Sequence, residues 1–206
     1  MLNCDEYLMP ESLDEAFDLI ERHAGRYRIV AGATDLLPWA REGRAGDVHY
    51  PVLIDISRVP ELDGVERRGD RLRLGANTTF ADFLNDAELR EALPIMPHVA
   101  VWFADDQIRE LATLAGNLIN ASPAADGTPP MIALNGTVTL ECRRDGDRRR
   151  RDPLYLAKYS CALRMTRGAS RTVAIMLGIA ISAKNPSTAL TAASIEATAA
   201  NTISAM

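Results

Sequence analysis

The stretch QIRELATLAGNLINASPAAD, residues 107–126, decides how this chain is organised. Small residues alternate in it with a few aliphatic ones, and it closes on Ser122-Pro123 and an isolated Asp126. A segment that only built a core would carry larger side chains, and a loop in solvent would not need Leu114 or Leu118. The pattern favours a buried backbone that approaches another group closely and binds it through peptide N–H groups and short hydroxyls. A tight crossover between packed elements is the alternative.

The composition is that of a globular protein rather than of a nucleic-acid-binding one. Hydrophobic residues make up 47% and charged residues 25% of the 206, which suits one large domain or two small ones. The formal net charge of −5 argues against nucleic acid as a partner. Up to Asp152 the chain has 18 basic and 27 acidic residues, whereas beyond it there are 5 basic residues and 1 acidic residue. The composition therefore changes character near residue 152.

The cysteines and histidines form no metal or disulfide pattern. Cys4, Cys142 and Cys161 stand far apart without Cys-x-x-Cys spacing, which argues for a reducing compartment and against a cysteine-bound cluster. The histidines are equally dispersed, so we predict no metal site. Acidic residues interrupt the N-terminal segment where a signal peptide would be apolar, and the longest apolar run, residues 173–183, is too short for a transmembrane helix. We expect a soluble, cytoplasmic protein without a membrane span.

The N-terminal third reads as alternating strands and helices, which favours parallel strands. Ser12 and Glu15 form a capping box that starts a helix. The turn Gly32-Ala33-Thr34-Asp35 lies between a strand and a helix, where free N–H groups can meet an anion. It matches neither Gly-x-Gly-x-x-Gly nor a Walker motif, and an ordinary capped turn is the alternative. The expected elements are a strand at 5–9, a helix after Ser12, a strand at 27–31, a helix at 36–41 and a strand at 51–56.

The middle of the chain reads as a hairpin followed by short helices. The expected elements are strands at 62–66 and 71–75, helices from Thr79, at 88–93, at 97–103 and near 130–134, and a strand at 137–142. The basic run 143–151 favours a hairpin turn with solvated arginines, with a phosphate or partner patch as the alternative. Residues 169–183 fit a buried strand or a helix, and residues 185–206 show no periodicity.

Two loops resemble those of a known family. AGATDL, residues 31–36, and TLAGNL, residues 113–118, are similar to Ala-Gly-Gly-Thr-Asp-Leu and Thr-Ile-Gly-Gly-Asn-Ile in the flavin-binding medium subunits of molybdenum hydroxylases, the xanthine dehydrogenase and aerobic carbon monoxide dehydrogenase family. In that family Ser-Pro and an Asp follow the second loop, as here. The resemblance covers roughly residues 5–155. Supporting segments are Tyr7–Pro10, Ser12–Ala16, Leu53–Ile56, Pro60–Leu62 and Leu74–Ala76.

The resemblance implies an α+β fold with two FAD-binding subdomains and FAD in the cleft between them. The first, residues 1–57, would be a small βαβ unit, and the second, residues 58–156, a mixed-sheet α/β unit. Residues 157–206 would be a divergent or truncated tail, because the match fades after Leu154. We favour an altered reading frame or a fragment there, and we expect the fold not to need residues beyond Leu156.

The resemblance also implies which residues bind FAD. We expect no covalent attachment, because neither loop has a His or Cys nearby, and we name no catalytic side chain, because the flavin supplies the chemistry. Asp126 would contact the polyol or ribose region of the cofactor. In the two loops, Ala33 and Ala115 replace glycines of the family; a positive φ at either would cost about 1 kcal/mol, or a methyl group would point at the phosphate. The loop residues implied to wrap the pyrophosphate are Ala31, Gly32, Ala33, Thr34, Asp35, Leu36, Thr113, Leu114, Ala115, Gly116 and Asn117.

The function implied by the resemblance is electron transfer. An FAD-dependent oxidoreductase subunit would take electrons from iron–sulfur centres on a partner chain and pass them to NAD⁺, oxygen or a quinone. An iron–sulfur subunit and a molybdopterin subunit would be its partners, because this chain has no cysteine cluster of its own. Two alternatives remain: a stand-alone flavoprotein reductase, and a degenerate, non-catalytic assembly module of the same fold.

Overall fold

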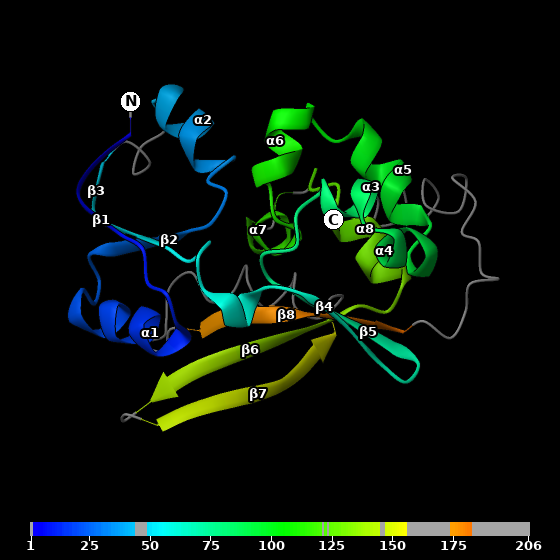
Figure 1. Cartoon of the computed structure of the whole chain (residues 1–206). Helices are drawn as coiled ribbons and strands as arrows, with labels where there is room; N and C mark the ends of the chain where they lie inside the picture. Colours follow the sequence, from blue (N-terminus) through cyan, green and yellow to red (C-terminus); the bar gives the residue numbers. More distant parts are fainter. Residues whose placement is uncertain are drawn as a thin grey trace, which may run out of the picture.

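The chain folds around two β-sheets with helices packed against them (Figure 1). This computed structural model describes residues 2–43, 49–120, 122, 124–144, 147–155 and 174–182. The two sheets lie on either side of residue 57, where the sequence suggests a subdomain boundary; the boundary itself stays a prediction. The segments 156–173 and 183–206, with their expectations of structure, lie outside the described residues.

The first sheet is small and parallel, as expected. Its strands β1 (Asn3–Leu8), β2 (Tyr27–Val30) and β3 (His49–Asp55) lie in the order β1-β3-β2. The connecting helices α1 (Leu13–Arg22) and α2 (Leu36–Arg41) lie on opposite sides of it (Figure 1). The crossover through α2 leads directly out of β2, so the loop between them is held at the carboxyl end of this strand, whose last residue, Val30, is buried.

Helix α1 begins where its sequence predicts. The Ser12 hydroxyl accepts a hydrogen bond from the Glu15 N–H (3.2 Å), and the Glu15 carboxylate accepts one from the Glu11 N–H (2.8 Å). The apolar face of α1 is buried in the core, with Phe17 only 1% exposed. The cap and the apolar face together fix which side of α1 meets solvent.

The second sheet is antiparallel at every pairing that the structure describes. Its strands are β4 (Val65–Arg68), β5 (Arg71–Gly75), β6 (Thr137–Arg144), β7 (Asp147–Tyr155) and β8 (Ala174–Ser182), in the order β4-β5-β8-β6-β7. Strands β5 and β6 run in the same direction, and β8 runs opposite to both in the gap between them. The α+β class is thus confirmed, whereas the described pairings of this sheet are all antiparallel rather than mixed, because β8 lies between the two strands that run in the same direction.

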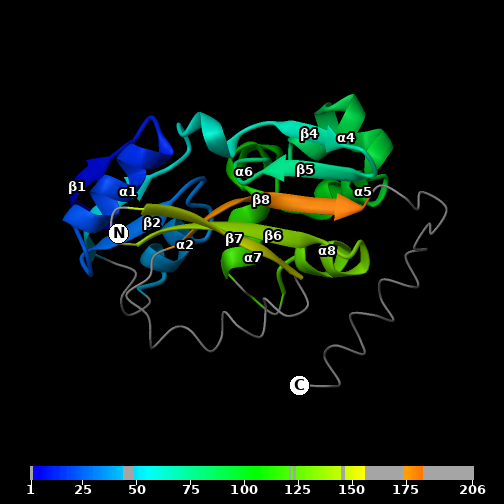
Figure 2. The ribbon, with the colours of Figure 1, turned by 90° about the horizontal axis from the view of Figure 1, so that it is seen from below.

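Between β5 and β6 the chain forms a layer of short helices on one face of the second sheet (Figure 2). Side-chain caps start several of them: Asp86 and Asp105 accept hydrogen bonds from the N–H groups of Leu89 (3.0 Å) and Ile108 (2.9 Å). These helices are α3 (Asp82–Asn85), α4 (Ala87–Ala92), α5 (Ile95–Trp102), α6 (Asp106–Leu111), α7 (Leu114–Asn120) and α8 (Thr128–Ala133). The short 3-10 helix η1 (Pro60–Leu62) comes earlier, between β3 and β4. No helix in the described ranges is long and apolar enough to cross a membrane.

Strand β8 is a central strand rather than a dispensable tail. Ile179 is paired in register with Leu74 on one side and Val138 on the other, and all three are fully buried. This position argues against the expectation that the fold does not need residues beyond Leu156, which the truncation below tests. The physical reason is that burial of apolar side chains such as Ile179 and Ile181 inside the fold stabilises it.

The basic run forms the expected hairpin, but one of its arginines is not solvated. Strands β6 and β7 flank residues 145–146, which lie outside the described residues. The side chain of Arg143 is 12% exposed and contacts carboxylates of α1. The expectation of solvated arginines is therefore wrong at Arg143. The side chains of residues 147–151 lie outside what the structure describes, so the patch there stays a prediction.

We predict that a chain ending at Leu156 loses its cooperative unfolding transition, because β5 and β6 would each lose a partner strand. In the full chain, Ile179→Ala should lower the free energy of unfolding by about 2–4 kcal/mol. Val101→Ala, at a side chain that is 58% exposed, serves as the control and should change it by less than about 0.5 kcal/mol. Urea unfolding followed by circular dichroism measures all three. A truncated chain that unfolds as cooperatively as the full one would contradict this role of β8.

Candidate cofactor-binding site

A cavity of about 420 Å³ lies where the two subdomains meet. Both loops identified in the sequence line it, and so do further residues from each subdomain. The predicted residues on the cavity wall are Ala31, Gly32, Ala33, Thr34, Asp35, Leu36, Thr113, Ala115, Gly116 and Asn117. The lining residues that the sequence analysis missed include Arg28, Trp39, Ile56, Ala76, Asn77, Phe103, Ala112, Ile119 and Asn120.

The first loop is held by a direct backbone contact with the second subdomain. A Cβ atom on Gly32 would lie 1.7 Å from the carbonyl oxygen of Leu111, so no side chain fits there. Leu111 comes immediately before Ala112 and Thr113, which line the cavity. Glycine at position 32 therefore brings the two loops together by allowing their backbones to touch.

The N–H groups of this loop point to anion binding. Among the residues that the structure describes, the N–H groups of residues 32–35 form no hydrogen bond, and the Asp35 side chain does not cap α2. Backbone donors without an acceptor are costly unless water or a ligand satisfies them. Several such donors on one cavity wall suit the oxygens of a diphosphate.

Ala33 carries the backbone strain that its replacement of glycine suggests. Its φ is +54°, in the left-handed region that a Cβ atom disfavours by about 1 kcal/mol. Ala115 is different, because it lies inside α7, is 4% exposed, and is not among the described non-glycine residues with positive φ. Only the first of the two departures from the family pattern therefore costs conformational energy.

The second loop is the start of α7. Thr113 Oγ1 accepts a hydrogen bond from the Gly116 N–H (3.0 Å), as an N-cap does. Just before it, the Phe80 N–H donates to the Ala112 carbonyl oxygen (3.0 Å), and the Leu114 N–H donates to the Thr78 carbonyl oxygen (2.9 Å). These bonds fix the loop to the rest of the second subdomain. Leu114 is fully buried and does not line the cavity, so the structure gives it a core position.

One side-chain hydrogen bond crosses the cavity rim. Asn120 Nδ2 at the end of α7 donates to Asp35 Oδ2 at the start of α2 (3.0 Å). Partial desolvation raises the pKa of Asp35 above its ordinary value, and the bond from Asn120 offsets part of that rise. Among the described residues that line the cavity, Asp35 and Arg28 are the charged ones. The wall therefore presents backbone donors and apolar surface rather than a cluster of cations.

Asp126 lies apart from the cavity. It is exposed and does not line it, although its neighbour Gly127 donates its N–H to Asn117 Oδ1 on α7 (2.9 Å). The structure does not bring Asp126 together with the loop residues, so its contact with a cofactor stays a prediction. No group of three or more His, Cys, Asp or Glu in the described residues could hold a metal ion.

An aromatic wall was missed by the sequence analysis. Phe103 lines the cavity and stacks on Phe80, with ring centroids 3.9 Å apart and an angle of 12°. Arg109 holds this turn, since its Nη1 donates to the carbonyl oxygens of Phe103 (2.6 Å) and Ala104 (2.8 Å). The sequence signal for this wall was Arg109, six residues after Phe103 at a helix end. That pattern is too common to predict an aromatic cavity wall by itself.

We predict opposite effects for the same substitution at the two alanines. Ala33→Gly should raise the free energy of unfolding by about 0.5–1 kcal/mol, because it relieves the positive φ. Ala115→Gly should lower it by about 0.5–1 kcal/mol, because glycine weakens α7. Urea denaturation of both variants beside the parent chain measures the difference. Effects of the same sign would show that the strain at Ala33 does not govern the loop.

Comparison with known proteins agrees with this geometry. Residues 3–167 match the family model described as the FAD binding domain in molybdopterin dehydrogenase. The chain is 32% identical over 136 residues to the carbon monoxide dehydrogenase medium chain of Hydrogenophaga pseudoflava, which covers 66% of this chain and 46% of that protein. It is 31% identical over 157 residues to the nicotine 6-hydroxylase medium subunit of Paenarthrobacter nicotinovorans, covering 76% and 54%.

A solved structure shows the same fold. Carbon monoxide dehydrogenase from Hydrogenophaga pseudoflava, in a form that lacks the Mo-pyranopterin moiety of the molybdenum cofactor, superposes with a TM-score of 0.69 at 26% identity. The match covers 88% of this chain and 60% of that one, and the chain spans about half the length of the curated relatives it matches. The family match, the two loops and the cavity between them agree on FAD as the cofactor, and the chain belongs to the family of FAD-binding domains found in molybdopterin dehydrogenases.

Proposed function

We propose that this chain is the FAD-binding part of an electron-transfer subunit in a molybdenum hydroxylase complex. The observation that supports it most is the single cavity lined by both loops, with open N–H groups on one of them. The relatives named above are the medium chain and medium subunit of oxidoreductases, which supports a role inside a larger assembly. Bound FAD would supply the redox chemistry, and the protein would supply its position and surroundings.

In this proposal each wall of the cavity has a separate task. Gly32, Ala33 and Thr34 would bind the diphosphate through their N–H groups, and Gly116 would leave room for it beside Thr113. The hydrogen bond from Asn120 to Asp35 would close the rim and keep the Asp35 carboxylate directed at an amide rather than at phosphate. No side chain is assigned a proton-transfer role.

The partners belong to the proposal as well. We include an iron–sulfur subunit and a molybdopterin subunit, because the given sequence has no cysteine cluster and the iron–sulfur centres of such a complex would lie on another chain. The final acceptor would be NAD⁺, oxygen or a quinone. The three scattered cysteines support a reducing compartment, so we include the cytoplasm.

One observation favours the alternative of a non-catalytic assembly module. Ala33 places strain in the loop that would hold the diphosphate, which lowers the affinity expected for FAD. Flavin content after purification separates the two. A yellow protein, or a colourless one that takes up added FAD, supports the electron-transfer proposal; a folded protein that rejects FAD favours the assembly module.

We predict that blocking the cavity abolishes FAD binding. Thr34→Trp places a large ring on the cavity wall and should raise the Kd for FAD at least tenfold. The control is Leu37→Trp, because Leu37 lies three residues later, in the first turn of α2, is 42% exposed and does not line the cavity. Titration of apo-protein with FAD, followed by flavin fluorescence quenching, measures both. Equal affinities would place the cofactor elsewhere.

We also predict that FAD is held without a covalent bond. Among the described residues that line the cavity there is no histidine or cysteine to form an attachment. Precipitation of the FAD-loaded protein with trichloroacetic acid should therefore release all the flavin into the supernatant. Absorbance at 450 nm that stays with the pellet would contradict this.

A further inference from the structure

The acidic residues of α1 form one charged face. Asp14, Asp18 and Glu21 follow an i, i+4, i+7 spacing, which puts their carboxylates on the same side of the helix. Like charges at these spacings repel and destabilise a helix by a few tenths of a kcal/mol per pair. A cation from elsewhere in the fold would offset this repulsion between the carboxylates.

That cation is Arg143, which comes from β6 in the second subdomain. Its Nη1 contacts Asp18 and lies 3.9 Å from Glu21 Oε2, and its Nη2 donates to Asp14 Oδ1 (3.1 Å). The carboxylates are more than half exposed, whereas the Arg143 side chain is 12% exposed. The bond with Asp18 raises the pKa of the guanidinium above its ordinary value, so Arg143 stays charged.

The same guanidinium packs on the core as well as on the acids. Its central carbon lies 5.6 Å from the centre of the Phe17 ring, and Phe17 belongs to the same buried cluster as Ile54 of β3. Arg143 therefore reaches both the charged and the apolar side of α1. A planar guanidinium held in this way fixes how α1 is oriented relative to β6, which apolar packing alone does not do because it is not directional.

Arg143 joins the two subdomains at a place remote from the cavity. Figure 1 shows β6 ending beside α1, while α2, which flanks the cavity, lies on the other side of the first sheet. At the cavity the two subdomains are joined by the contact of Gly32 with Leu111 and by the Asp35–Asn120 bond. The first subdomain is thus held on both sides of its sheet.

The first sheet connects these two sides rigidly. Helix α1 packs on β3, β3 is paired with β2 through four residues, and β2 leads straight into the loop at Gly32. A rotation of α1 against β6 would therefore move the loop against α7. The separation of the two loops decides whether a diphosphate bound to the N–H groups of the first loop also fits against the second.

We propose that Arg143 is a positioning residue for FAD: by clamping the acidic face of α1 it sets the distance between the two cofactor-binding loops. This inference rests on the proposed function. It makes FAD affinity depend on a contact that touches no part of the cavity, since Arg143 does not line it.

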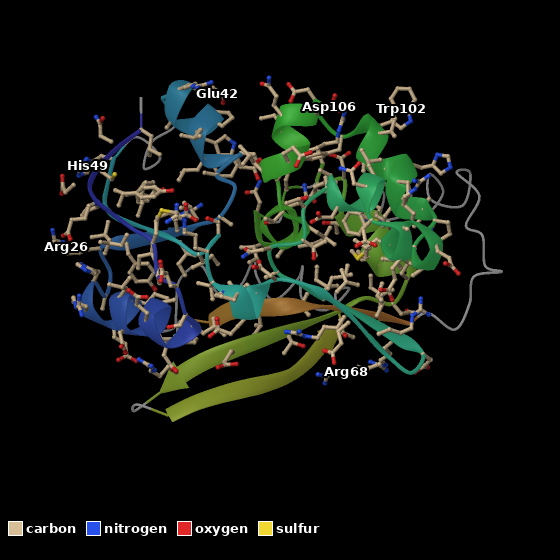
Figure 3. All side chains as sticks on the ribbon, viewed as in Figure 1. Arg26, Glu42, His49, Arg68, Trp102 and Asp106 are labelled. Atoms are coloured by element: carbon tan, nitrogen blue, oxygen red, sulfur yellow. The ribbon has the colours of Figure 1, made fainter. Side chains whose placement is uncertain are left out.

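The test compares Arg143→Met with Arg68→Met. Arg68 also makes an ion pair, with Glu66 (2.8 Å), but both lie on β4, and Figure 3 shows Arg68 on the hairpin away from α1. We expect Arg143→Met to raise the Kd for FAD about tenfold and Arg68→Met to leave it unchanged. Asp18→Asn/Glu21→Gln, which changes only exposed side chains, should raise it similarly and should add nothing to Arg143→Met in the combined variant.

A second readout does not need FAD. The chain has two tryptophans, Trp39 on the cavity wall and Trp102, which is 88% exposed at the end of α5 (Figure 3). In a Trp102→Phe background, acrylamide quenching reports on Trp39 alone. Loss of the clamp, in either the Arg143→Met or the acid-side variant, should raise the quenching constant about twofold.

The outcomes separate this inference from the proposed function. If the parent chain binds FAD and the clamp variants bind it equally well, the inference is overturned and the function stands. If the parent chain rejects FAD, the proposed function fails, and the inference that Arg143 sets the loop distance is then decided by Trp39. Unchanged quenching in the clamp variants overturns it.

Discussion

The structure depends on a backbone-to-backbone contact between its two subdomains. Gly32 lies so close to the Leu111 carbonyl that even a methyl group is excluded, and this contact brings two loops 80 residues apart to one cavity. Two neighbouring hydrogen bonds hold the elements around this contact in place: Thr113 caps α7, and Asn120 donates to Asp35 at the start of α2. A cofactor held mainly by N–H groups needs such an arrangement, because main-chain donors act only where the chain itself is brought.

The parts of this fold that could be predicted from sequence are those set by local chemistry. Ser12 and Glu15 begin α1 because a capped N-terminus is a property of a few neighbouring residues, and the alternation of β2, α2 and β3 is visible in the hydrophobic pattern. Most loop residues of the site were also predictable, because glycine and small residues are used where backbones approach. That these residues bind FAD came from the family resemblance, because no local pattern identifies the cofactor.

The parts that could not be predicted depend on contacts distant in sequence. The run 173–183 is almost continuously apolar, so it shows neither the two-residue period of a half-buried strand nor the 3.6-residue period of a helix. Nothing local therefore shows that β8 lies between β5 and β6. Arg143 lies in a run of arginines, and only the fold reveals that this one meets the acids of α1.

The two alanines that replace family glycines show how one pattern can hide two physical situations. At Ala115 the backbone is helical, and there alanine is the better residue than glycine. At Ala33 the backbone stays left-handed although the side chain disfavours it, because Gly32 on one side and the Asp35–Asn120 bond on the other fix the loop. The strain persists because the contact between the subdomains over-determines the loop. The loop conformation therefore belongs to the interface between the subdomains rather than to the local sequence.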